Sequence, residues 1–241
     1  MSIFAISDLH LSFNKKVGLK NINPKEDIYK PMEVFGWYKH YDLISSNWLK
    51  HVTDKDTVLI PGDISWAMKI EQVINDFHWL SLLPGRKVLS PGNHCYYAAS
   101  KRKLAKVLPS GMYWLDGDFL EIEGKFIVAT RGWILPGEDN FTANDMKIYL
   151  RQAGRLKMAL ESCLKHSHGK DIIAMLHFPP ITKNITKSLF LDLMLDYKVT
   201  ICVYGHLHGL NIKDAVEGNI SGIEFRLVSC DAIGFKPLKI C

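Results

Sequence analysis

The sequence has little that would direct a protein into or across a membrane, and we expect no such segment. No apolar run approaches the roughly 18 residues that a membrane-spanning helix needs. No basic stretch precedes the first apolar run and no cleavage site follows it, so we expect no signal peptide. Internal repeats, low-complexity stretches and linkers are absent as well. We therefore expect one domain over residues 1–241.

Cysteine is scarce and scattered, and the chain has no C-x-x-C pair. The five cysteines are odd in number and widely spaced, at Cys95, Cys163, Cys202, Cys230 and Cys241. This pattern favours reduced thiols over a disulfide framework, and we expect a cytoplasmic protein.

The chain has only a small excess of charge of one sign. Thirty Lys and Arg against 25 Asp and Glu give a net charge of +5. This charge fits an anionic substrate but is too small and too dispersed to indicate nucleic acid binding. The tightest basic cluster, Lys101-Arg102-Lys103, lies in a helix-like stretch and is best interpreted as a solvated face.

Short apolar segments alternate with amphipathic ones along the chain, which predicts an α/β domain. Strands are predicted at 2–7, 57–61, 87–90, 125–130, 172–176, 200–204 and 224–229. Helices are predicted at 34–51, 70–83, 142–166 and 188–197, the third of them opening with a capping box at Thr142 to Asp145. The later strands are candidates for a second sheet.

Polar side chains that suit a metal follow five of these strands. In chain order the clusters are Asp8-Leu9-His10, Gly62-Asp63, Gly92-Asn93-His94, His177 and Gly205-His206-Leu207-His208. In α/β sheets the carboxyl ends of the strands are where ligands bind. Each cluster alone is a weak signal, but five of them in one chain, each at a strand end, indicate a functional site.

The residue types in these clusters are those that a site with two metal ions needs. Carboxylate oxygens, an amide oxygen and imidazole nitrogens suit Mn, Fe or Zn rather than Ca or a site for Mg alone. The D-x-H and H-x-H spacings place two side chains on the same face of an extended segment. The two can then approach one metal ion together or divide between two.

The order of these clusters resembles that of the calcineurin-like metallophosphoesterase superfamily, namely D-x-H, G-D, G-N-H-[D/E], H and G-H-x-H. The resemblance extends from Asp8 to His208. The segment G-D-I-S-W-A at 62–67 is also similar to a bacterial branch of predicted phosphohydrolases. The resemblance implies a four-layer α/β/β/α sandwich, a β-sandwich flanked by helices, with the site at the carboxyl edge of the strands.

The resemblance also implies a role for each residue. Asp8, His10 and His208 would hold the first divalent transition metal, and Asn93, His177 and His206 the second. Asp63 would bridge both, and His94 would be the general acid. We expect Mn, Fe or Zn, and hydrolysis of a phosphomonoester or phosphodiester by a hydroxide that bridges the metals, with a small molecule as the substrate.

The chain departs from the family pattern in three places. Cys95 stands where the family usually has Asp or Glu after G-N-H, which removes the usual partner of His94, and we favour packing over a reactive thiol for Cys95. Residues 13–51 are an insertion candidate with four aromatic residues, Trp37, Tyr38, Tyr41 and Trp48, which pack in the core or stack on a substrate. The Asp-Arg-Gly of protein Ser/Thr phosphatases is missing, which argues against a protein phosphatase.

Arg131 follows the strand at 125–130 and is a candidate for a phosphate contact, with Lys183 and Lys187 as weaker candidates. Two alternative functions stay open, a non-catalytic scaffold on the same fold and a nuclease of the same superfamily. The sequence leaves the substrate, the choice between monoester and diester, the native metals and the oligomeric state undetermined.

Overall fold

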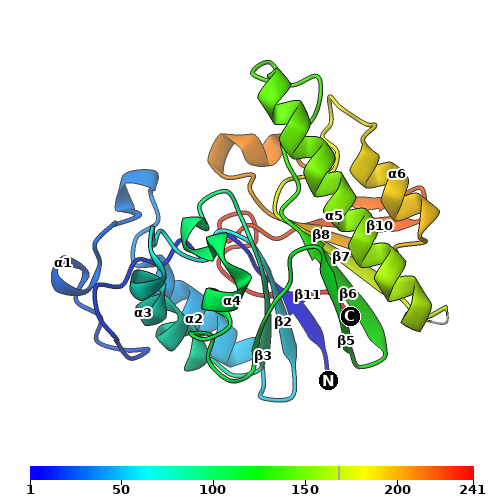
Figure 1. Cartoon of the computed structure of the whole chain (residues 1–241). Helices are drawn as coiled ribbons and strands as arrows, with labels where there is room; N and C mark the ends of the chain where they lie inside the picture. The colour runs from blue at the N-terminus through cyan, green and yellow to red at the C-terminus, as the bar shows by residue number, and fades with distance from the viewer. Residues whose placement is uncertain (168) are drawn as a thin grey trace.

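The computed structural model describes residues 1–167 and 169–241 and contains two β-sheets packed face to face (Figure 1). The first sheet has the order β11-β1-β2-β3-β4. Its strands are β1 (Ile3–Ala5), β2 (Thr57–Pro61), β3 (Arg86–Ser90), β4 (Met112–Trp114) and β11 (Leu238–Lys239). The second sheet has the order β5-β6-β7-β8-β10-β9. Its strands are β5 (Asp118–Ile122), β6 (Lys125–Thr130), β7 (Ile172–Leu176), β8 (Ile201–Tyr204), β9 (Gly218–Ile220) and β10 (Ile223–Leu227).

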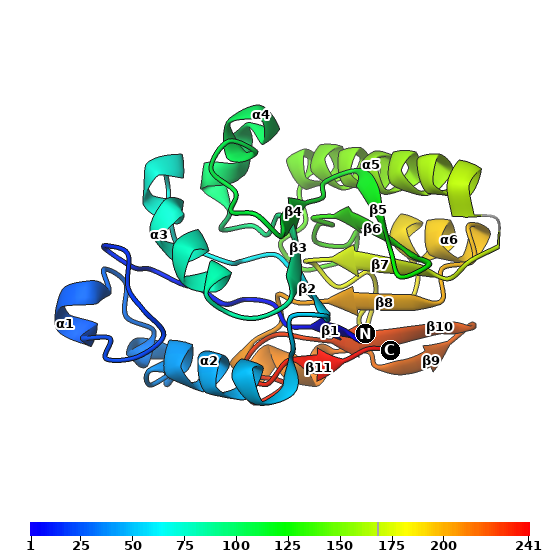
Figure 2. The same cartoon turned by 90° about the horizontal axis from the view of Figure 1, so that it is seen from below.

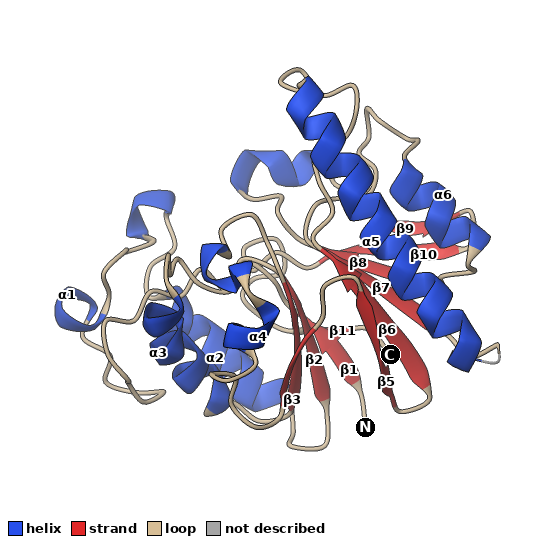
Figure 3. Cartoon of the chain, in the orientation of Figure 1, coloured by secondary structure: helices blue, strands red, loops and turns tan. Residues whose placement is uncertain are grey.

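Helices cover the outer face of each sheet, as the view in Figure 2 and the colouring of Figure 3 show. On the first sheet lie α2 (His40–His51) and α3 (Ile70–Ser81), with the short α1 (Pro24–Asp27), α4 (Lys101–Leu104), η1 (Glu33–Phe35) and η2 (Tyr96–Ala99) in neighbouring connections. On the second sheet lie α5 (Ala143–Ser167) and α6 (Leu189–Asp196), and η3 (Gly209–Asp214) follows β8.

Three hydrophobic clusters separate the four layers. The side chains along β1 point alternately to its two faces and so contribute to two of these clusters. Ile3 and Ala5 point into the cluster between the two sheets, whereas Phe4 and Ile6 point toward α2 and α3. A third cluster lies between the second sheet and the helices α5 and α6. The predicted four-layer α/β/β/α sandwich is therefore confirmed.

All seven predicted strands are present, and the described residues form four further strands that the sequence did not predict. The missed strands β4, β5, β9 and β11 are the edge strands of the two sheets. An edge strand is paired on one side only and is less buried, so its sequence does not form a continuous apolar run. β5, for example, includes the exposed Asp118 and Glu121, and Ile122 is its one buried residue.

The predicted helix at 34–51 was wrong in its first part. Only a short 3-10 turn forms at Glu33–Phe35, and α2 begins at His40. Gly36 and Lys39 both have positive φ, at 80° and 45°, which ends the first turn and separates it from the helix. The helices predicted at 70–83, 142–166 and 188–197 form with small changes at their ends.

The predicted capping box opens α5. The backbone N–H of Thr142 donates to Asp145 Oδ2 at 2.9 Å, and the N–H of Asp145 donates to Thr142 Oγ1 at 3.3 Å. This helix is amphipathic, because it buries Tyr149, Leu156 and Leu160 on one face. Within the described residues, no helix combines the length and the apolar character that crossing a bilayer requires.

The segment 13–51 packs mainly into the core beside the first sheet. Tyr41 and Trp48 are fully buried there, so they belong to the core, whereas Tyr38 is exposed. Trp37 is 8% exposed and reaches a different position, at the rim of the site described below. That this segment is an insertion into a smaller domain stays a prediction.

Candidate active site at the carboxyl edge of the two sheets

The turns after five strands bring the sequence-predicted ligands to one place. β1, β2 and β3 run parallel, as do β6, β7 and β8, so their carboxyl ends lie at the same edge. Ser7 and Ser229 form a parallel bridge that joins the ends of β1 and β10. Four candidate residues have positive φ, which is uncommon outside glycine and indicates backbone strain at a functional site: Asp8, His10, Asp63 and His206.

The first group of candidate ligands consists of Asp8, His10 and His208. One ligand atom from each lies within 4.8 Å of the others, a spacing that can hold a metal ion. His208 Nε2 is 2.9 Å from Asp8 Oδ1. The buried Nδ1 of His10 has no hydrogen-bond partner among the described residues.

The second group consists of Asn93, His177 and His206. Asn93 Oδ1 lies 2.7 Å from His177 Nε2 and 3.1 Å from His206 Nδ1. Asp63 lies between the two groups, because its Oδ2 is 3.4 Å from His177 Nε2 and 4.0 Å from His10 Nε2. The structure thus brings all seven predicted ligands together.

Two glycines allow the carboxylates to approach the backbone closely. A Cβ on Gly92 would lie 2.1 Å from Asp63 Oδ1, and a Cβ on Gly205 would lie 2.3 Å from Asp8 Oδ2. Contacts this short do not occur in folded proteins. Because glycine has no Cβ, Gly92 leaves room for the carboxylate of Asp63, and Gly205 leaves room for that of Asp8.

Hydrogen bonds hold two of the histidines in a fixed orientation. His177 Nδ1 lies 3.0 Å from the carbonyl oxygen of Pro61, and His208 Nδ1 lies 3.0 Å from Asp231 Oδ1. In both rings this leaves Nε2 directed into the centre of the cluster. Asp231 was missed in the sequence, although it stands two residues after the strand predicted at 224–229.

The electrostatics of the cluster favour ionised carboxylates. Burial raises the pKa of Asp8, but the attraction of His208 and His177 outweighs it and holds this pKa well below its usual range. Burial likewise raises the pKa of Asp63, and the attraction of His177 and His10 lowers it below its usual value. Burial lowers the pKa of His208, but Asp8 and Asp231 outweigh it and raise the value to about 10.

His94 lies at the edge of the cluster rather than inside it. Its side chain is 32% exposed, and its Nε2 lies 3.9 Å from Asp63 Oδ2. Its backbone N–H donates to Asp63 Oδ1 at 2.9 Å, which fixes the loop against that carboxylate. Burial lowers the pKa of His94 below its ordinary value, although Asp63 opposes the shift.

Cys95 is buried and packs under the same loop. Its Sγ accepts a hydrogen bond from the N–H of Gly92 at 3.3 Å, and burial raises its pKa to about 11. The side chain is therefore a protonated thiol at neutral pH, which agrees with packing and not with a reactive thiolate.

The donor set and its surroundings fit divalent metal binding. The buried Asp8 and Asp63 lie with His10, His177 and His208 in groups whose ligand atoms are within 4.8 Å of one another, and the buried Nδ1 of His10 lacks a partner in the described part of the chain. A cation there would offset the cost of burying Asp8 and Asp63 in the charged form. Oxygen and imidazole ligands suit Mn, Fe and Zn.

An apolar cavity of about 360 Å³ borders the first group of ligands. Trp66 stacks on His10 with ring centroids 4.6 Å apart, and Trp37 lies 5.3 Å from His208. Lys30 Nζ lies 3.1 Å above the Trp66 ring. Trp37 is thus the one aromatic residue of the four named in segment 13–51 that borders a cavity at the site; Trp66 and Lys30 were missed in the sequence.

The three basic residues that are candidates for a phosphate contact lie in different surroundings. Arg131 lines a second cavity next to Asn93. Lys183 and Lys187 are exposed, and Lys183 Nζ donates to the carbonyl oxygen of Lys213.

The four-layer fold, with the seven candidate ligands clustered at its strand ends, is the architecture of a metallophosphoesterase. A model of the calcineurin-like phosphoesterase family matches residues 1–210. The chain belongs to this family and is therefore a hydrolase that acts on phosphoester bonds. Asp231 lies beyond the matched residues.

The solved structures that the chain resembles are distant in sequence. The chain is similar to the phosphopantetheinyl hydrolase PptH from Mycobacterium tuberculosis, with a TM-score of 0.57, 15% identity and coverage of 95% of this chain and 88% of that one. A protein of unknown function from Aquifex aeolicus, AQ665, matches with a TM-score of 0.45 and 19% identity over 99% of this chain and 95% of that one. No curated protein matches the chain significantly.

Proposed function

We propose that the chain is a phosphohydrolase that depends on two divalent metal ions and cleaves a phosphomonoester or phosphodiester of a small molecule. The observation that supports this proposal is the arrangement of the seven ligand candidates. They come from five strand ends and form two groups, with Asp63 Oδ2 placed 3.4 Å from His177 and 4.0 Å from His10.

The proposed roles of the ligands are those that the resemblance to the family implies, and this arrangement supports them. Asp8, His10 and His208 would hold one metal ion, Asn93, His177 and His206 the other, and Asp63 both. When bound, the two ions would supply the positive charge that activates the attacking water and neutralises the phosphoryl oxygens. Asp231 and the Pro61 carbonyl would keep the rings of His208 and His177 in the orientation that this requires.

His94 is our candidate for the group that gives a proton to the leaving oxygen. Its ring is partly exposed and lies beside Asp63, at the boundary between the ligand cluster and the apolar cavity. His94→Ala should slow hydrolysis of alkyl phosphates by about 10²–10⁴-fold. It should slow nitrophenyl phosphates much less, because nitrophenolate leaves without protonation. An equal loss with both esters would instead assign His94 to positioning the phosphate.

A substrate panel tests the proposal directly. It contains a nitrophenyl phosphomonoester, a phosphodiester, cyclic nucleotides and a phosphopantetheine diester, each with added Mn, Zn, Fe or Mg. The last compound is included because PptH is a phosphopantetheinyl hydrolase, although its similarity to this chain supports the fold alone.

The variant Asp63→Asn tests whether the chain is an enzyme or a non-catalytic scaffold on the same fold. A neutral amide bridges two cations poorly, so this variant should lose hydrolysis of every substrate found while it stays folded. Asp196→Asn, at the exposed end of α6, is the matched control and should keep full activity. Unchanged turnover in Asp63→Asn would contradict the bridging role, and an inactive wild-type protein that still binds metal would favour the scaffold.

We also propose a reducing, cytoplasmic location. The five cysteines support it, because all of them are free and four are buried.

A further inference from the structure

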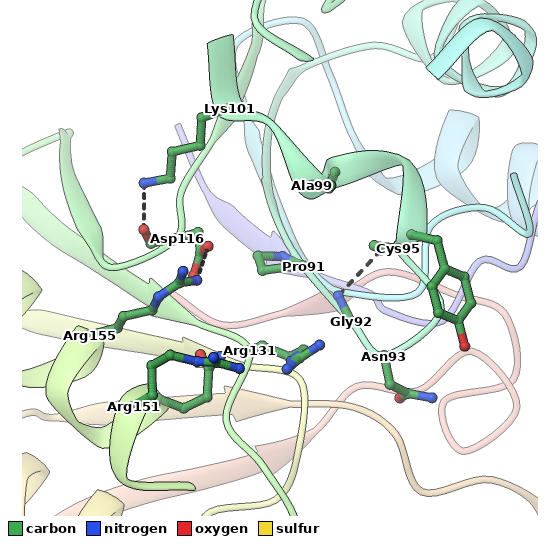
Figure 4. A pocket seen from close by; sticks show the side chains of 13 residues that line it. Pro91, Gly92, Asn93, Cys95, Ala99, Lys101, Asp116, Arg131, Arg151 and Arg155 are labelled. Atoms are coloured by element: carbon green, nitrogen blue, oxygen red, sulfur yellow. Dashed lines mark hydrogen bonds and ion pairs between the residues drawn. The ribbon is translucent and has the colours of Figure 1, made fainter. Parts of the chain in front are cut away.

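A strongly basic cavity of about 430 Å³ lies next to the candidate metal centre (Figure 4). Asn93 is the one member of the seven ligand candidates that lines it. Four cationic side chains and one carboxylate face this space: Lys101, Arg131, Arg151, Arg155 and Asp116. These side chains have no role in the proposed reaction, in which the seven ligands hold the metals and His94 protonates the leaving oxygen.

Arg131 is held rigidly relative to the metal ligands. Its carbonyl oxygen accepts the backbone N–H groups of His177 at 3.1 Å and Phe178 at 3.0 Å. Its guanidinium lies 4.4 Å from the centre of the Trp133 ring, and Trp133 Nε1 donates to Asp145 Oδ1 at 3.0 Å. Its buried Nε has no hydrogen-bond partner among the described residues. A fixed guanidinium with a free donor is suited to binding an anion.

The helix α5 supplies two further arginines one turn apart. Arg155 forms an ion pair with Asp116, and Lys101 Nζ donates to the carbonyl oxygen of Asp116. Asp116, the one carboxylate that lines the cavity, is thus already paired with Arg155. Among the residues that the structure describes, Arg131 and Arg151 have no ion-pair partner. The cavity therefore keeps an excess of positive charge beside Asn93.

We propose that this cavity binds a second phosphate group of the substrate while the scissile phosphate lies at the metal ligands. The proposal rests on the proposed phosphohydrolase function and narrows its substrates to phosphoesters that bear another phosphate. Arginine guanidinium groups bind phosphate through two parallel hydrogen bonds, and Arg131 and Arg151 are the groups free to do so. The apolar cavity lies on the side of His10 and His208, so the two cavities flank the centre and can receive chemically different parts of one substrate.

A pair of substrates that differ in one phosphate tests the proposal. Adenosine 3′,5′-bisphosphate and adenosine 5′-monophosphate are compared by kcat/KM with the metal-loaded full chain. We expect the bisphosphate to be preferred by about tenfold or more, since each charge-assisted hydrogen bond to the second phosphate adds selectivity. In Arg151→Gln this preference should fall by about tenfold. Arg102→Gln removes the same charge from the neighbouring α4 without lining the cavity, and should keep the preference.

Sulfate binding, measured by calorimetry on the same protein, separates the cavity from the catalytic function. Sulfate should bind the wild type and Asp63→Asn alike, and bind at least about tenfold more weakly to Arg131→Gln and Arg151→Gln. Equal kcat/KM for both nucleotides, or a preference that Arg151→Gln leaves intact, would overturn the proposal. Equal losses with both nucleotides in Arg151→Gln would also overturn it, because the arginine would then contact the scissile phosphate. If no ester is hydrolysed, the proposed function fails, and the sulfate measurement alone decides whether the cavity binds anions.

Discussion

Replacement of Gly92 by alanine should disable the site without changing any ligand. The added Cβ would lie 2.1 Å from Asp63 Oδ1 and 2.4 Å from the backbone N of Asp63. Carbon and oxygen atoms that are not bonded stay more than about 3 Å apart, so the Asp63 carboxylate would have to move by roughly 1 Å. A misplacement of this size costs about 10²-fold in rate when a group must be aligned with the reacting atoms.

The assay compares Gly92→Ala with Gly154→Ala, which adds the same methyl group elsewhere. Gly154 lies on α5, and its Cβ would meet nothing within 4 Å. That variant should keep full activity and gain roughly 0.5–1 kcal/mol in stability, because alanine favours a helix over glycine. Metal content and phosphoester hydrolysis are measured for both. If Gly92→Ala binds metal and turns over as Gly154→Ala does, the close packing of Gly92 on Asp63 does not position the carboxylate.

Two further predictions concern residues behind the ligands. Asp231→Asn should weaken metal affinity by about 10–100-fold in a Mn titration, because it removes the carboxylate that orients His208, and an unchanged affinity would contradict this role. Asp76 accepts a hydrogen bond from the N–H of Phe13 and pairs with Ser65 Oγ, and burial raises its pKa from 3.8 to about 7. The folded chain then keeps a proton that the unfolded chain releases between about pH 4 and 7, so this group makes stability fall as pH rises through that window. In Asp76→Asn the free energy of unfolding should no longer fall between about pH 4 and 7 on account of this group. Toward pH 8 the variant should be more stable than the wild type, by about 1.4 kcal/mol for each unit of pKa shift. A difference in stability between the two proteins that stays the same at all pH values, measured by urea unfolding, would refute this prediction.

The sequence was informative about the site where the ligands follow buried strands. Asp8, Asp63 and His206 come directly after apolar runs or after the glycine that ends them, and the parallel arrangement of strands then brings these ends to one edge. Such residues are recognisable because two local signals coincide, a buried strand and a change to polar ligand types.

The residues that sequence reasoning missed depend on contacts between distant segments. Asp231 reaches His208 because β8 and β10 pair in parallel, so the loops that follow them leave the second sheet side by side at the same edge. Arg151 and Arg155 lie on the exposed side of an amphipathic helix, where arginine is common for solvation alone. Nothing local distinguishes them until the fold places α5 beside the loop of Asn93.

The measurement that tests the central claim most directly is anomalous X-ray scattering from crystals grown with Mn²⁺. We predict two peaks about 3.5–4 Å apart. One should lie against Asp8, His10 and His208, the other against Asn93, His177 and His206, with Asp63 in contact with both. A single peak, peaks outside these residues, or none in protein that has been given Mn²⁺ would contradict the assignment of a two-metal phosphohydrolase.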